Sequence, residues 1–316
     1  MQKIIVVGGG VSGLSFIRKI REKRSDVKIT LVDKASHSFN KSDFLNTFSF
    51  RNRIDLGQFC SETKVEFIQD ALERINVRRK KIYFKNKESR DFEKLVIATG
   101  LKSKKITAKG EHREGFFYLS SFDLLALRNR IKMFNEITVF VSTILGVKLA
   151  LGLRGLGKDV SIVTGGFDFL GLHKEKLENY FRENDISVYQ AAIEEAIGEG
   201  TVKAVKIKPL KILSSQIVLV DSGFTVNRDF FEEDIKIRDN FFTDCQDLYF
   251  VGDVNNSNID GELFFGADSS SAESQGESLA DYILDGKQPV IEISNYDKEK
   301  AINNIASNRV NAIFRE

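Results

Sequence analysis

Residues 4–13 read IIVVGGGVSG, a short apolar run of mostly β-branched residues that enters a glycine-rich loop. Glycines at positions 8, 10 and 13 match the GxGxxG pattern of a dinucleotide-binding loop. A stretch with apolar residues at helical spacing follows to about Arg24, and a second apolar run, 27–32, closes on Asp33. Because the pattern lies between a predicted strand and a predicted helix, and an acid follows Gly13 by twenty residues, we predict a nucleotide-binding βαβ unit.

Each glycine of this loop has a separate physical role in such a unit. Gly8 permits the tight turn, Gly10 lets backbone amides approach a pyrophosphate, and Gly13 lets the helix pack closely on the strand. The helix N-terminus adds unpaired N–H groups and a partial positive charge. Asp33 can accept hydrogen bonds from a ribose diol. The alternative is a glycine-rich turn without a ligand.

Three further motifs accompany this loop. Residues 95–100 read LVIATG, an apolar strand that ends in Ala-Thr-Gly, and residues 248–253 read LYFVGD, a strand that ends in Gly-Asp. Residues 272–280, AESQGESLA, are typical of a helix start. For Asp253 taken alone, the alternative is a turn residue at a strand end.

Taken together, these motifs resemble the FAD- and NAD(P)-binding pyridine nucleotide-disulfide oxidoreductase superfamily, over roughly residues 1–286. Within it, residues 95–130 are most similar to the NADH dehydrogenase type 2 and rubredoxin reductase branches. The resemblance implies an α/β fold with two Rossmann-like three-layer domains, the second inserted in the first. The FAD domain would comprise residues 1–108 and 226–286, the NAD(P)-binding-like domain 109–225, and a C-terminal helical tail 287–316.

The resemblance also implies roles for individual residues. The three glycines would hold the FAD pyrophosphate, Asp33 the adenosine ribose, and the backbone of Leu72 would face the adenine. Asp253 would bind the ribityl chain or the pyrophosphate, and Gln275 would lie at a helix start beside the flavin pyrimidine. The complete set of predicted cofactor-binding residues is Gly8, Gly10, Ser12, Gly13, Asp33, Lys34, Leu72, Ala98, Thr99, Gly100, Gly252, Asp253 and Gln275.

A second copy of the architecture follows the first. Residues 137–146 read ITVFVSTILG, and the strand 217–223, IVLVDSG, resembles the Ala-Thr-Gly strand of the family. Between them the pattern predicts a helix over 147–156 and a strand over 160–164. Val141 and Thr143 replace the first two glycines, and their branched side chains would crowd a pyrophosphate. Thr164 to Gly166 lie where an acid or a base would contact a nicotinamide dinucleotide. NAD(P) binding is therefore doubtful.

Lys148 lies where the family has a glutamate, two residues past the last glycine. If that position faces the flavin, as the resemblance implies, a cation there would raise the flavin reduction potential. The alternative is a solvated helix lysine. The second domain would either be only a structural cover for the flavin, or the electrons would come from a partner protein or a non-nicotinamide small molecule.

Composition excludes several classes of protein. The chain of 316 residues is 42% hydrophobic and 29% charged, with a net charge of +2, so neither a nucleic acid nor an acidic partner is implied. Cys60 and Cys245 form no CxxC pair, and the three histidines have no metal-ligand spacing. We expect no metal site, no transmembrane segment and no signal peptide, and therefore a cytoplasmic protein.

Other features fit ordinary structural roles. The cations at 78–81 are expected in a β-hairpin turn. The aromatic runs 116–118 and 264–265 could pack over a flavin, although core packing is the simpler interpretation. In the tail, apolar residues from Ile302 to Phe314 recur at helical spacing, which favours packing on the chain or on a second subunit in a homodimer.

We therefore expect an FAD-dependent oxidoreductase that passes electrons through the flavin from a donor other than ordinary NAD(P)H. Donor and acceptor, a small molecule or a redox protein, are not identified by the sequence. No residue resembles an acid–base catalyst, as expected if the flavin performs the chemistry. One alternative is an NAD(P)H-dependent flavoprotein reductase, in which Gly146 and an altered loop suffice. Another is a flavin-binding or assembly protein without turnover.

Overall fold

A computed structural model describes residues 3–39, 53–120, 124–209, 211–239, 241–255 and 269–288. The described chain divides into two compact units. The first contains the described residues up to Leu101 and those from Val226 onward, and the second contains the residues between them. The second unit is therefore inserted into the first.

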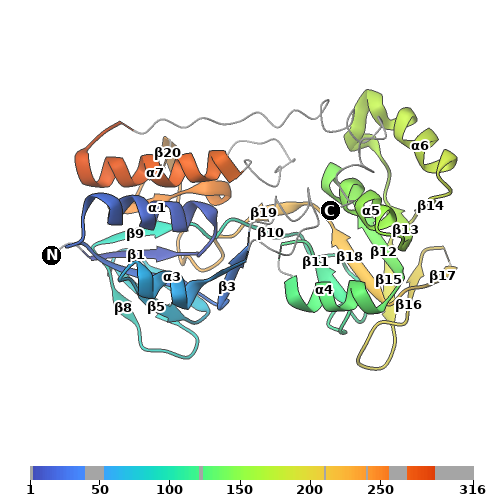
Figure 1. The fold of residues 1–316 in the computed structure, drawn as a ribbon, viewed down its shortest axis with the longest axis horizontal. Coiled ribbons are helices and arrows are strands. Elements are labelled where there is room, and N and C mark those ends of the chain that lie inside the picture. Colours follow the sequence, from blue (N-terminus) through green and yellow to red (C-terminus); the bar gives the residue numbers. More distant parts are fainter. Residues whose placement is uncertain are drawn as a thin grey trace. The chain divides into compact units, whose positions relative to one another are not determined.

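A seven-stranded sheet forms the centre of the first unit (Figure 1). Its strands from β22 to β5 are parallel, whereas β20 and β21 are antiparallel to their neighbours. Residues 4–7 are all buried, as expected for a parallel sheet covered on both faces. The order is β20 (Ile237–Asp239), β21 (Phe242–Thr243), β22 (Leu248–Phe250), β9 (Lys94–Ile97), β1 (Lys3–Val7), β2 (Lys28–Asp33) and β5 (Glu66–Gln69).

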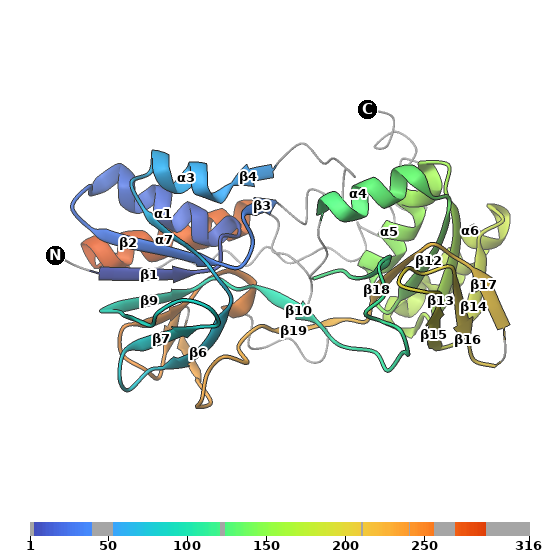
Figure 2. The same cartoon turned by 90° about the horizontal axis from the view of Figure 1, so that it is seen from below.

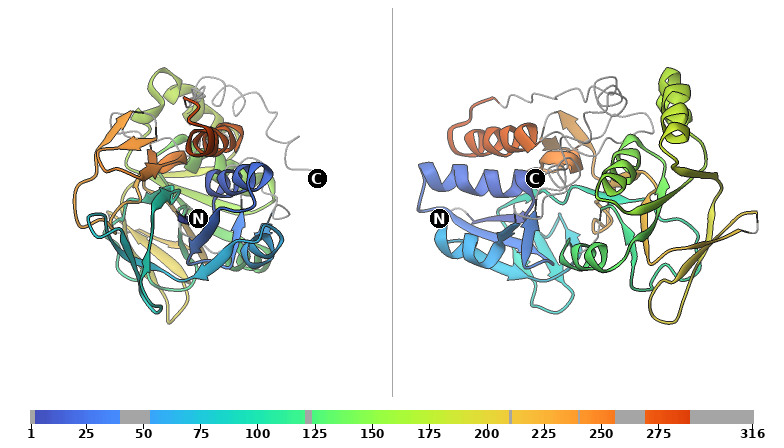
Figure 3. Two further views of the ribbon diagram at one scale, coloured as in Figure 1. Left: turned by 90° about the vertical axis from the view of Figure 1, so that its left-hand side faces the viewer. Right: turned by 45° about the vertical axis from the view of Figure 1, so that its right-hand side comes forward.

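The alternation of side chains along β1 builds the two covering layers. Ile4 and Val6 pack against the helices α1 (Val11–Lys23), α3 (Leu56–Glu62) and α7 (Ser269–Asp285). Ile5 and Val7 face the antiparallel strands β6 (Leu72–Asn76) and β7 (Lys81–Phe84), with β8 (Arg90–Asp91) at their edge. Figure 2 shows helices and antiparallel strands on opposite faces of the sheet, and Figures 1 and 3 show α1 and α7 side by side.

The second unit repeats this plan. Its parallel sheet has the order β11 (Phe116–Tyr118), β18 (Ile217–Asp221), β12 (Glu136–Val141), β13 (Asp159–Thr164) and β14 (Ser187–Gln190). An antiparallel sheet of β15 (Ile193–Ile197), β16 (Ala204–Ile207) and β17 (Lys211–Ser214) shares a core with β11 and β18. Its helical segments are α4 (Leu124–Met133), α5 (Ile144–Gly155), η1 (Asp168–His173) and α6 (Lys174–Glu183). The order β11-β18-β12-β13-β14 matches β22-β9-β1-β2-β5 of the first unit.

The predicted α/β fold with two Rossmann-like three-layer domains is thereby confirmed. Two short ladders complete it: β3 (His37–Phe39) with β4 (Arg53–Asp55), and β10 (Leu101–Ser103) with β19 (Phe224–Val226). A short helix, η2 (Gly252–Asn255), follows β22. The aromatic pair 264–265 and the predicted tail helix lie outside the described residues. Among the residues described, no helix is long and apolar enough to cross a bilayer.

Candidate functional site

The glycine-rich loop joins β1 to α1 at the carboxyl end of β1. Gly8 has φ +107°, and its N–H donates to the carbonyl of Val32 at 2.8 Å. A Cβ at Gly8 would overlap the carbonyl of Ala98, and a Cβ at Gly13 would overlap that of Gly8. Both glycines are therefore required by the protein's own packing: Gly8 by its backbone conformation, and Gly13 by the close approach of α1 to the strand.

Gly10 is not required by packing. It is the N-cap of α1, with φ −76° and no side-chain cap, and a Cβ there would meet no atom within 4 Å. Among the described residues, the N–H groups of residues 10–13 find no acceptor. These donors surround a space at the positive end of a helix, which is the environment that a pyrophosphate needs. The loop therefore fits the phosphates of FAD.

Asp33 lies beside this loop at the end of β2. Its Oδ2 accepts the N–H of Gly9 at 2.7 Å, and its Oδ1 accepts that of Ala35 at 2.9 Å. Each carboxylate oxygen has a second lone pair, so Asp33 keeps acceptor capacity for ribose hydroxyls. Lys34, the next residue, is exposed. Asp33 thus orients the loop and remains able to bind the sugar.

Leu72, the predicted adenine contact, is held close to the end of β2 by a series of hydrogen bonds. The N–H of Asp70 donates to the carbonyl of Asp33 at 3.1 Å, and Leu72 begins β6 two residues later. The buried carboxylate of Asp70 accepts the N–H of Ala71 at 2.7 Å and that of Asn86 at 2.9 Å. Burial by itself would raise the pKa of Asp70, but these hydrogen bonds outweigh burial, and the pKa is lowered. An ionised Asp70 therefore holds the start of β6 beside the end of β2.

The Ala-Thr-Gly motif follows β9 and is tied to a segment distant in sequence. Ala98 is buried and donates its N–H to the carbonyl of Val7 at 2.8 Å. The hydroxyl of Thr99 donates to the carbonyl of Asn227 at 2.8 Å, and the N–H of Asn227 donates to the carbonyl of Gly100 at 3.1 Å. Asn227 therefore fixes the turn that the family resemblance places below the flavin.

The Gly-Asp motif lies at the start of η2 and packs on the loop helix. Gly252 has φ +76°, and a Cβ there would overlap the hydroxyl oxygen of Ser12. Its N–H donates to Oε1 of Gln275 at 3.0 Å. Asp253 follows, half-buried. The structure therefore places both Ser12 and Gln275 against Gly252.

One expectation about Gln275 needs correction. The helix begins at Ser269, so Gln275 lies about two turns inside α7 rather than at its start. The partial positive charge of the helix end belongs to the serines at 269–271, because the effect is confined to the first turn. Gln275 acts instead through its side chain, which holds the backbone of Gly252.

Arg228 and Asn227 were not identified from the sequence. Arg228 donates from Nε to the carbonyl of Val254 at 3.1 Å and lies 4.5 Å above the ring of Phe250. Burial lowers the pKa of its guanidinium. Neither residue belongs to a motif that we recognised, and their partners lie far away in the sequence. Together they connect the turn after β9 with the turn after β22.

In the second unit the equivalent loop is built differently. Thr143 caps α5, and its hydroxyl accepts the N–H of Leu145 at 3.2 Å. The N–H of Gly146 donates to Asp221 Oδ2 at 3.0 Å. Thr164, in the predicted dinucleotide-contact segment, donates its hydroxyl to the carbonyl of Gly166 at 2.9 Å. Lys148 is half-buried in α5, and burial lowers its pKa. The loop lacks the open glycine geometry found at Gly10.

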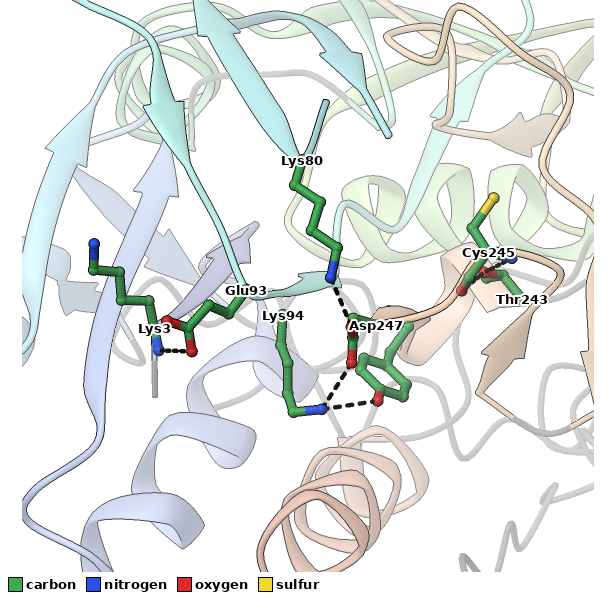
Figure 4. Close-up of polar contacts among 8 residues, drawn as sticks. Lys3, Lys80, Glu93, Lys94, Thr243, Cys245 and Asp247 are labelled. Atoms are coloured by element: carbon green, nitrogen blue, oxygen red, sulfur yellow. Dashed lines mark hydrogen bonds and ion pairs between the residues drawn. The ribbon is translucent and has the colours of Figure 1, made fainter. Parts of the chain in front are cut away.

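Cations of the basic turn at 78–81 form ion pairs with acidic residues of neighbouring segments. Arg78 pairs with Glu233 at 2.9 Å, and Lys80 pairs with Asp247 at 2.8 Å. Lys94, in β9, contacts the same Asp247 at 2.9 Å (Figure 4). Burial opposes ionisation of Asp247, but the two lysines outweigh it and lower its pKa. The turn is thus a structural ion-pair cluster.

Neither cysteine has the environment of a redox thiol. Cys60 is buried, and burial raises the pKa of its thiol to about 11. Burial and Asp244 raise the pKa of Cys245, whose backbone N–H donates to the hydroxyl of Thr243 (Figure 4). Both thiols are free. Among the described residues, no group of three or more His, Cys, Asp or Glu side chains could hold a metal ion.

The sequence of this chain is similar to those of known proteins. A family model described as pyridine nucleotide-disulphide oxidoreductase matches residues 2–271. Apoptosis-inducing factor 3 of Homo sapiens is 25% identical over 234 residues, 70% of this chain and 38% of that protein. Rubredoxin-NAD(+) reductase of Pseudomonas putida is 25% identical over 170 residues, 51% of this chain and 44% of that protein. The chain thus spans less than half the length of these relatives.

Solved structures share the fold. An NAD-dependent persulfide reductase from A. fulgidus superposes with a TM-score of 0.73 at 20% identity, covering 90% of this chain and 60% of that one. At this identity the similarity demonstrates the architecture alone.

Proposed function

Because the chain belongs to the pyridine nucleotide-disulphide oxidoreductase family, we propose that it is an FAD-dependent oxidoreductase whose electron donor is not NADH or NADPH. The observation that carries the proposal is the contrast between the two loops. At Gly10 the amides of a helix N-terminus surround an open space. At the second loop, the corresponding amides donate to a carboxylate of the chain itself.

Different residues of the first unit bind different parts of FAD. The loop at residues 10–13 holds the pyrophosphate through backbone N–H groups, and Asp33 binds the adenosine ribose. Thr99 and Gly100 line one side of the cofactor, and Asp253 contacts the ribityl chain or the pyrophosphate. When bound, FAD supplies two-electron transfer between a donor and an acceptor. The chain contributes binding and orientation, and no side chain is assigned as an acid or base.

A second candidate function is an NAD(P)H-dependent reductase. It is favoured by the names of similar proteins, which include NAD(+) and NAD-dependent activities. In that case Gly146 and the altered loop would still accept a dinucleotide. We prefer the first candidate because Val141, Thr143 and Lys148 all depart from the family pattern. A flavin-binding protein without turnover is a third candidate, and slow exchange of electrons with every donor tried would support it.

The partner of the flavin is proposed by chemical class alone. The name of one similar protein couples rubredoxin to NAD(+), so a small redox protein is one class of acceptor or donor, and a small molecule is the other. A homodimer and a cytoplasmic location remain predictions.

Lys148 provides a test of flavin tuning. If it lies near the flavin, as the family position implies, Lys148→Glu will lower the flavin midpoint potential, because a negative charge disfavours reduction. Spectroelectrochemical titration of both proteins measures this effect. An unchanged midpoint potential would leave Lys148 as an ordinary helix lysine.

The experiment that tests the proposed function is an anaerobic titration of the FAD-loaded protein with NADH and NADPH, followed by absorption. We expect flavin absorption bands that neither nucleotide bleaches rapidly but that dithionite does. Rapid bleaching would select the NAD(P)H-dependent reductase. A protein without affinity for FAD would overturn both.

A further inference from the structure

Asp221 is a fully buried carboxylate at the carboxyl end of β18, with 0% of its surface exposed. Its Oδ2 accepts the N–H of Thr143 at 2.8 Å, the hydroxyl of Thr143 at 2.9 Å and the N–H of Gly146 at 3.0 Å. A longer contact of 3.4 Å comes from the N–H of Ser142. One carboxylate oxygen thus accepts the hydrogen bonds donated by the loop that begins α5.

The two units can be compared residue by residue at this point. Val7 of β1 pairs with Ile97 of β9, and Phe140 of β12 pairs with Val220 of β18. The next residue after each partner is Ala98 in the first unit and Asp221 in the second. The carboxylate of the second unit therefore arises at the position where the first unit has a methyl group.

The loop amides correspond in the same way. By their places in the pattern, Thr143 and Gly146 are equivalent to Gly10 and Gly13. In the first unit, within the described chain, the N–H groups of Gly10 and Gly13 have no acceptor; in the second, the equivalent N–H groups are bonded to Asp221. A carboxyl oxygen of the chain itself therefore already occupies the second loop.

Gly146 confirms that the carboxylate is built into the packing. A Cβ at Gly146 would lie 2.5 Å from Asp221 Oδ2 and 2.9 Å from Asp221 Cβ. In the first unit, a Cβ at Gly13 would lie 3.2 Å from Ala98 Cβ. The last glycine of the second loop therefore has a structural purpose in this chain: it leaves room for Asp221.

We propose that the carboxyl group of Asp221 takes the place of a dinucleotide pyrophosphate in the second loop and thereby closes this unit to NAD(P). This inference rests on the proposed function and names the residue responsible for the choice of donor. A pyrophosphate would find two of the loop amides already used, and a charged Asp221 would repel it at short range. The donor must then be recognised without the phosphate cradle of α5.

The charge state of Asp221 is consistent with a closed site. Burial raises the pKa of its carboxyl, while the hydrogen bonds from the loop oppose that shift. Among the described residues, Oδ1 is buried without a hydrogen-bond partner. In either protonation state Oδ2 remains an acceptor for the loop amides, so the cradle is filled whether or not the group is charged.

The inference separates two causes of a closed loop. If the missing glycines alone prevent binding, Val141→Gly with Thr143→Gly will restore it. If Asp221 prevents binding, that double variant will fail and the added change Asp221→Ala, which copies Ala98, will be required. The probe is ADP-ribose, which carries the pyrophosphate but cannot reduce a flavin, titrated by calorimetry into FAD-saturated protein.

We expect the triple variant to bind ADP-ribose about tenfold or more tightly than the double variant, the equivalent of regaining roughly one charge-assisted hydrogen bond. Equal binding by the double and triple variants would overturn the inference, and so would no binding by either. Thermal unfolding and FAD content of each variant are measured first, so that a folding defect is recognised.

The reciprocal variant Ala98→Asp keeps the test decisive if the triple variant does not fold. It places a carboxylate beneath the first loop and should reduce FAD uptake about tenfold or more. Wild-type FAD affinity in a folded Ala98→Asp protein would contradict the role given to Asp221. The proposed function fails separately, if the wild type itself takes up no FAD.

Discussion

The Gly10→Ala substitution tests whether Gly10 is needed to bind the ligand rather than to stabilise the fold. A Cβ at this position meets no atom within 4 Å, and the backbone has φ −76°, which alanine adopts without strain. We therefore expect the free energy of unfolding of the apoprotein to change by no more than about 0.5 kcal/mol. The added methyl group nevertheless stands in the space that we assign to the FAD pyrophosphate.

The expected loss of affinity follows from the contacts at the helix N-terminus. A phosphate displaced by the methyl group loses one charge-assisted hydrogen bond to a first-turn amide, worth about 1.5–3 kcal/mol. The Kd for FAD should therefore rise about ten- to a hundredfold. Fluorescence titration of the apoprotein with FAD measures it, and urea unfolding of the same preparation measures stability.

Two control variants complete this experiment. Gly13→Ala forces a Cβ onto the carbonyl of Gly8, so both stability and FAD affinity should fall, stability by about 1–3 kcal/mol. Gly165→Ala also fills open space, in the second unit, and should change neither. A Gly10→Ala protein with wild-type stability and wild-type FAD affinity would refute the placement of the pyrophosphate at this loop.

Three further predictions concern charge, thiols and positioning. Asp247, whose folded pKa is lowered, stabilises the protein above its ordinary pKa and ceases to do so as pH falls through the folded value; Asp247→Asn should cost about 1 kcal/mol at pH 7 and progressively less as the pH falls through the folded pKa. Urea unfolding over this pH range checks this, and a cost that does not change with pH would contradict it. Replacing Cys60 by Ala and Cys245 by Ser should leave turnover and flavin reduction unchanged, whereas loss of flavin reoxidation would identify a redox thiol. Arg228→Met should remove the hydrogen bond to the η2 carbonyl and weaken FAD binding about fivefold, measured by titration; unchanged affinity would show that Arg228 has no part in shaping the site.

The first unit could be predicted largely from local patterns. A strand, a glycine loop, a helix and an acid at the right spacing determine a βαβ unit, and the carboxyl ends of parallel strands necessarily meet at one edge of the sheet. For that reason Asp33, Thr99 and Gly252, though distant in sequence, were expected together. The buried run at 4–7 and the basic turn at 78–81 were likewise readable from residue type.

What escaped prediction depends on contacts that no local pattern encodes. Asp221 reads as the last residue of an apolar strand, and its donors are found far earlier in the chain. The backbone of Asn227 exchanges hydrogen bonds with Thr99 and Gly100 after β9, and Arg228 donates to the carbonyl of Val254 in η2. The helix α7 begins at Ser269, before the predicted start at Ala272, in a run of serines, a residue type common at helix N-termini.

The central claim is that one unit of this protein holds FAD while the other is closed to nicotinamide dinucleotides. The most direct measurement is the anaerobic absorption spectrum of the FAD-loaded protein during addition of one equivalent of NADH, then NADPH. We predict flavin bands that persist through both additions. Immediate bleaching by either nucleotide would contradict the account.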